Sequence, residues 1–92
     1  MSGGMRLLPW NGPDGQRCYL STDEGGGYLS RLADDMEEMQ LGTSEELLRH
    51  VNELMAGPAE VTARELRFCV HRLCEALRDA LRIAESRGGR VP

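Results

Sequence analysis

The segment from Thr62 to Gly88 constrains the fold most, because it contains no proline and no glycine before its last residue. Thr62 and Glu65 have the spacing of a capping box, in which the threonine hydroxyl and the glutamate carboxylate each accept a backbone amide proton at the start of a helix. The segment predicts one helix over residues 63–87, about 38 Å long at 1.5 Å per residue. In a chain of 92 residues, a helix of this length is expected to have the other elements packed along most of its length.

Two shorter helices are expected before this long one. Residues 28–41 place apolar side chains at spacings of three and four, and Gly42 is expected to end that helix. Thr43 and Glu46 repeat the capping-box spacing, and the pair Gly57-Pro58 is a stop signal, so a second short helix is expected over residues 44–56.

Residues 1–27 differ in character from the rest. Pro9 and Pro13 disfavour a helix because they lack an amide proton, and the turn-forming run NGPDG lies between two short apolar pieces. The glycines 25–27 then separate this part from the expected helices. We expect an extended or loosely hairpin-like N-terminal arm over 1–27 and a three-helix domain over 28–92. The fold class expected is therefore all-α, a small bundle of two short helices and one long C-terminal helix.

One side of the long helix carries a near-heptad apolar stripe, which suits packing against another helix. Because a chain of this size has a small core, we expect the stripe to form the centre of a homodimer, with the long helices of two chains antiparallel. The expected dimer core consists of Leu66, Val70, Leu73, Leu77 and Leu81.

A basic strip runs along another side of the same helix, and its members are Arg64, Arg67, His71, Arg78 and Arg82. Three interpretations remain open. The strip is a solvated face, or it pairs with the acidic flank of residues 28–41 in the same chain or a partner, or it binds an acidic protein or a nucleic acid. Phe68 projects away from the apolar stripe, and either the arm or a second chain is expected to cover it. The residues expected to bind a partner are Arg64, Arg67, Phe68, Arg78, Arg82, Trp10 and Tyr19.

The three cysteines, Cys18, Cys69 and Cys74, are an odd number, which is not the pattern of a secreted disulfide framework. Cys69 and Cys74 flank the apolar stripe about 140° apart on the helix and cannot grip one ion together. A metal site would need Cys18, His71 and Cys74 to converge. Packing at the edge of the core is the favoured interpretation, so no metal and no cofactor are expected.

No arrangement of residues indicates catalysis. The three glycines are not fed by a buried strand and no lysine comes after them, so a phosphate-binding loop is not indicated. The net charge of −4 disfavours a nucleic-acid binder, and no run of residues is apolar enough for a membrane span. We expect a non-enzymatic, cytoplasmic interaction module, a dimeric regulator or adaptor that binds another protein. The alternatives are a transcription-associated factor that touches nucleic acid through the arginines, and a metal- or redox-responsive regulator.

Overall fold

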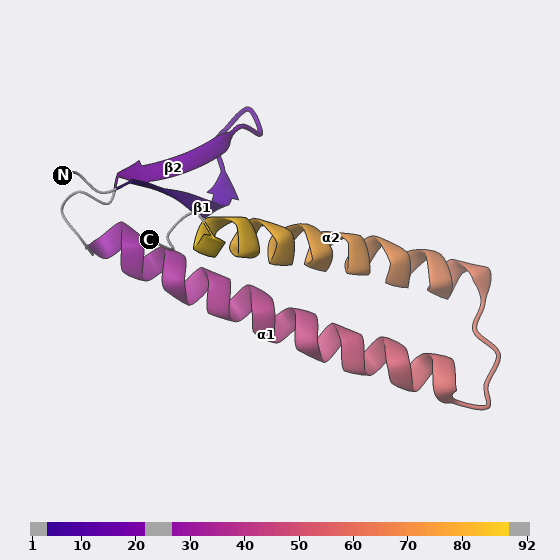
Figure 1. Cartoon of the computed structure of the whole chain (residues 1–92). Coiled ribbons are helices and arrows are strands. Elements are labelled where there is room, and N and C mark those ends of the chain that lie inside the picture. Colours follow the sequence, from indigo (N-terminus) through magenta and orange to yellow (C-terminus); the bar gives the residue numbers. More distant parts are fainter. Residues whose placement is uncertain (1–3, 22–26, 89–92) are drawn as a thin grey trace.

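The chain folds into a β-hairpin and two long antiparallel helices (Figure 1). The computed structural model describes residues 4–21 and 27–88. The strands are β1 (Met5–Asn11) and β2 (Arg17–Ser21), and the helices are α1 (Tyr28–Ala56) and α2 (Ala63–Gly88). The expected all-α bundle of three helices is therefore wrong, because two helices and a two-stranded antiparallel sheet are present instead.

The two short helices expected over 28–41 and 44–56 are one continuous helix of 29 residues. Gly42 does not take the left-handed conformation that ends helices, since the glycines with positive φ among the described residues are Gly15 and Gly27. Ser44 turns its hydroxyl back to donate to the Gln40 carbonyl at 2.8 Å, one turn earlier. A single glycine inside a helix costs about 1 kcal/mol relative to alanine, and the flanking Leu, Glu and Gln residues favour the helix enough to offset this.

The expected capping box at the start of α2 is confirmed. The Thr62 hydroxyl accepts the Glu65 amide proton at 3.1 Å, and the Glu65 carboxylate accepts the Thr62 amide proton at 2.9 Å. The bond from the Thr62 backbone amide lowers the pKa of the Glu65 carboxyl, and the Thr62 side chain adds to this effect. On the other side of the loop between the helices, α1 stops at Ala56, directly before Gly57-Pro58, as the sequence indicates.

The described part of the N-terminal segment is a β-hairpin, one of the two forms expected for it. Leu7 pairs with Tyr19 and Asn11 with Arg17, and the register shifts between Leu7 and Asn11, the stretch that contains Pro9. Proline has no amide proton to give to the ladder, which is why it occurs at such irregularities. In the turn, Gly15 has a φ of 81° and donates to the Gly12 carbonyl at 3.0 Å. The glycines 25 and 26, expected to separate the arm from the helices, lie outside the described residues.

The hairpin packs on the end of the helix pair where α1 begins and α2 finishes (Figure 1). Leu7 and Leu8 are buried there together with Ala33 of α1 and Ile83 of α2. Polar bonds complete the contact: Ser86 Oγ donates to the Leu7 carbonyl at 2.9 Å, and Gln40 donates to the Pro9 carbonyl at 3.3 Å.

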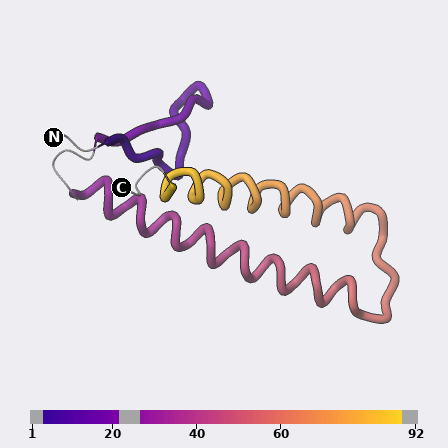
Figure 2. The backbone as a smooth tube through the Cα atoms, in the orientation of Figure 1, coloured from indigo at the N-terminus to yellow at the C-terminus, as the bar shows by residue number. Residues whose placement is uncertain are grey.

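The helices extend far beyond this small core, and Figure 2 shows the chain as a long rod with a loop at one end. Its principal extents are 58 × 26 × 22 Å, and its radius of gyration is 16.8 Å. A compact domain of this length has a radius of gyration of about 12 Å. The rod leaves much apolar surface on the two helices without a covering layer.

Candidate functional site

The side of α2 that packs against α1 is not the apolar stripe expected to form the core of a dimer. The buried and half-buried apolar residues along the middle of α2 are Cys69, Leu73, Ala76, Ala80 and Ile83. Four of the five leucine and valine residues of the stripe are instead exposed, with Leu77 at 60% and Leu81 at 61%. At about 100° per residue, the exposed stripe is centred about 90° around the helix from the buried line.

This arrangement arises because the apolar sector of α2 is about 160° wide, from Ile83 at one border to Leu81 at the other. One neighbouring helix covers only part of so wide a sector. In this pair of helices α1 covers the half with small side chains, Ala76 and Ala80, and leaves the half with leucines open.

The first helix adds apolar residues to the same side of the molecule. On the flank of α2 away from the exposed leucines, Phe68 lines a hollow with His50 of α1, and Arg72 lines another with Thr43 of α1. These flanks of the two helices therefore lie on the same side of the helix pair. The exposed leucines of α2 lie on the opposite side of the helix pair, next to the second flank of α1. This flank has an apolar residue at every seventh position: Leu41, Leu48 and Met55.

We call this surface the open face. It consists of Leu41, Leu48 and Met55 from α1 and Leu66, Val70, Leu77 and Leu81 from α2. Leu41 is half-buried and the other six are exposed, with Leu48 at 55% and Met55 at 60%. Leu73, expected in the same set, lies half-buried at the inner border of the face.

Charged side chains of opposite sign border the open face along its two edges. Along α1 the edge is acidic as far as Glu45, with a hollow of about 520 Å³ whose lining includes Glu38, Leu41 and Glu45. Along α2 the edge is basic, and Arg67 and Arg78 project from it. Among the described residues, none of these four charged side chains forms an ion pair. Their charges are therefore available to a partner.

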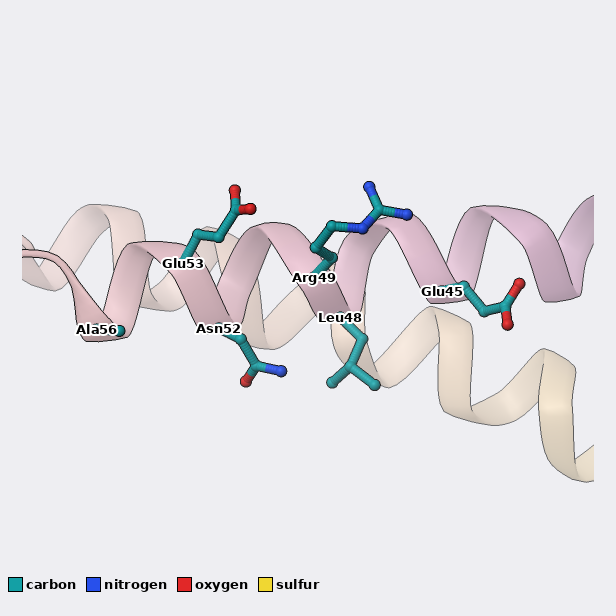
Figure 3. A pocket seen from close by; sticks show the side chains of 6 residues that line it. All are labelled: Glu45, Leu48, Arg49, Asn52, Glu53 and Ala56. Carbon is teal, nitrogen blue, oxygen red and sulfur yellow. The ribbon is translucent and has the colours of Figure 1, made fainter.

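Figure 3 shows the α1 border of the open face from close by. Leu48 and Asn52 lie on one edge of the helix, and Arg49 and Glu53 lie on the opposite edge. Together with Glu45 and Ala56 they line a shallow hollow of about 640 Å³. The hollow has an apolar side chain, Leu48, between polar ones, which is the composition of an interface border rather than of a closed cleft.

The remaining residues expected to bind a partner do not gather on the open face. Phe68, 65% exposed, lies on the opposite side in a hollow of about 460 Å³ shared with His50 and Leu54. Trp10 is half-buried and Tyr19 exposed, and both belong to the β-hairpin. The hairpin thus packs over the end of α2 that holds Ile83 and leaves Phe68 uncovered.

Cys18 lies far from Cys74 along the rod. Cys18 is next to Arg17, which pairs with Glu85 near the end of α2, whereas Cys74 lies 11 residues earlier, about 16 Å along the helix axis. All three cysteines have free thiols, with Cys69 buried and Cys74 exposed. Over residues 4–21 and 27–88, no three His, Cys, Asp or Glu side chains are close enough to hold a metal ion. Cys18, His71 and Cys74 are not brought together.

Sequence patterns missed one feature that positions the whole site, a buried cluster around Arg6. The Arg6 guanidinium donates to the Ser30 carbonyl and hydroxyl, at 3.0 and 2.9 Å, and to Asp34 at 2.7 Å. It also lies 3.4 Å from Glu37, which Arg87 approaches to 3.8 Å. The cluster ties β1 to both helices. The sequence around Arg6, a short apolar strand, does not predict that this arginine is buried.

Comparison of the chain with models of protein families, with curated proteins and with solved structures finds no match. In the part of the chain that the structure describes, neither α1 nor α2 has the length and apolar character needed to cross a bilayer.

Proposed function

We propose that the protein is a small non-enzymatic interaction module that works as a homodimer in the cytoplasm, with the open face as its binding surface. The observation that carries the proposal is the row of exposed leucines and methionine along two adjacent helices. Contiguous apolar patches of this kind mark sites of protein association, because leaving them in water is unfavourable.

The size of the open face supports a site of association. From Leu66 to Leu81 it extends about 22 Å along the rod, and two packed helices present a face about 20 Å wide. The resulting projected area of about 440 Å² lies in the range of apolar patches that mark interaction sites.

The charge pattern favours a protein partner over a nucleic acid. The open face has an acidic edge along α1 opposite the basic edge along α2, and the acidic edge would repel a phosphate backbone. An apolar centre with mixed charges at its rim is typical of protein interfaces. The free thiols of all three cysteines fit a reducing compartment such as the cytoplasm.

Light scattering after size-exclusion chromatography tests the proposal. The protein should elute as a dimer at micromolar concentration, and Leu77→Glu should convert it into a monomer that keeps its helical circular dichroism. Phe68→Glu is the matched control, because Phe68 is equally exposed but lies on the opposite side. A wild-type monomer, or equal loss of the dimer in both variants, would contradict the open face as the interface.

A further inference from the structure

We infer that two copies close their open faces in a parallel arrangement, with α2 of each chain against α1 of the other. The two-fold axis then runs along the rod, and both β-hairpins lie at the same end of the dimer. This inference rests on the homodimer proposed above and specifies how the second copy binds.

Two-fold symmetry allows two ways of placing one two-helix face on another. If the axis runs along the rod, the chains point in the same direction and each α2 meets the partner's α1. If the axis runs across the rod, the chains point in opposite directions, and each α2 meets the partner's α2 while each α1 meets the partner's α1. Both arrangements give a four-helix bundle and cover the same leucines.

The charges at the two edges distinguish the arrangements. In the parallel dimer the basic edge of α2 lies beside the partner's α1 edge, and Arg78 meets its acidic stretch, with Glu38 and Glu45, while Arg67 is level with the partner's Asn52. In the antiparallel dimer each edge lies beside the same edge of the partner, so that basic residues face basic residues and acidic residues face acidic ones. Like charges across an interface are unfavourable, and charges of opposite sign set orientation.

The register within one chain shows which residues meet. Thr43 and Leu47 of α1 line one hollow with Arg72 and Ala76 of α2, which places Glu45 level with Cys74. An axis along the rod preserves these levels between chains. Cys74 therefore lies beside the partner's Glu45, and Arg78, one turn further along α2, lies between the partner's Glu38 and Glu45.

Within one chain, by contrast, Glu45 and Cys74 point away from each other. Glu45 projects from the outer edge of α1 and Cys74 from the outer edge of α2, so both helices separate them. A covalent link between positions 45 and 74 therefore reports a contact between two chains.

Cross-linking of the native thiol Cys74 to an introduced cysteine tests the arrangement. Full-length Glu45→Cys protein is treated with a short bis-maleimide, and linked peptides are identified by mass spectrometry. We expect links between positions 45 and 74 in a covalent dimer. The matched control is Glu46→Cys, whose side chain is equally exposed but leaves α1 on the side opposite the open face, and it should give at least tenfold less of the corresponding link.

The protein without an introduced cysteine tests the antiparallel arrangement. In the antiparallel dimer the two Cys74 residues lie near the axis and should link to each other, and that product would overturn the parallel arrangement. Equal linking from positions 45 and 46 would overturn it as well. Light scattering on the same samples separates the two proposals: a dimer linked through Cys74 alone retains the homodimer and rejects the arrangement, whereas a monomer rejects both.

Discussion

The guanidinium of Arg6 lies 3.4 Å from the carboxylate of Glu37, and solvent reaches only 2% and 3% of the two side chains. Arg6 belongs to β1 and Glu37 to α1, and Arg87 of α2 approaches the same carboxylate. This cluster joins all three parts of the fold at one end of the rod. Because burying a charge is costly without a partner, each member depends on the others.

Arg6→Ala should destabilise the protein by about 3 kcal/mol, because the buried Glu37 side chain would lose its closest cation. Urea unfolding at one fixed protein concentration measures the change, since dimerisation makes stability depend on concentration. In a double-mutant cycle with Glu37→Ala, the two losses should add up to more than the loss in the double variant. Strictly additive losses would show that the pair does not interact.

Gly42→Ala should stabilise the protein by up to about 1 kcal/mol, because Gly42 sits inside α1 and a Cβ there would meet no other atom within 4 Å. Gly15→Ala is the comparison: its Cβ also meets nothing within that distance, but its φ of 81° strains any other residue, and a loss of about 1 kcal/mol is expected. Thermal unfolding monitored by circular dichroism measures both. A destabilising Gly42→Ala would indicate a helix break at this position.

Thr62→Ala should cost about 1 kcal/mol, because it removes the hydroxyl that accepts the Glu65 amide proton at the start of α2. Thr43→Ala should be neutral or slightly stabilising, since Thr43 lies within a continuous helix and alanine has the higher helix propensity. Urea midpoints of the two variants distinguish these outcomes. Equal losses would mean that Thr43 also caps a helix.

The Arg17 side chain bonds to Glu85 and lowers the pKa of that carboxyl from its ordinary value of 4.5. A carboxyl whose pKa is lowered by folding stabilises the protein above its unfolded pKa, and this stabilisation is lost as the pH falls through the lowered value. Glu85→Gln should therefore reduce the drop in unfolding midpoint between pH 6 and pH 3. Glu60→Gln, in the loop between the helices, should leave that drop unchanged. An unaltered pH dependence in Glu85→Gln would contradict a role for the Arg17 pair.

The start of α2 and the end of α1 could be predicted from the sequence because the interactions that set them are local. The capping box of Thr62 and Glu65 and the stop at Gly57-Pro58 involve residues within one turn of each other, and both are present. The break expected at Gly42 was wrong because a glycine and a capping-box spacing are weak signals inside a long run of helix-forming residues. The sequence left the β-hairpin open as one of two forms for the N-terminal segment, because a two-stranded hairpin gains its stability from tertiary packing, here of β1 on α1 and α2.

The sequence by itself determined that α2 is a long capped helix with an apolar sector and a basic flank, since these properties depend only on spacing along one helix. Only the tertiary structure decided which part of that sector is covered. The α1 helix partly covers the side of α2 that holds Ala76 and Ala80, while Leu77 and Leu81 remain exposed. Helical periodicity identifies which residues share a side, but the choice of side depends on contacts between residues far apart in the chain.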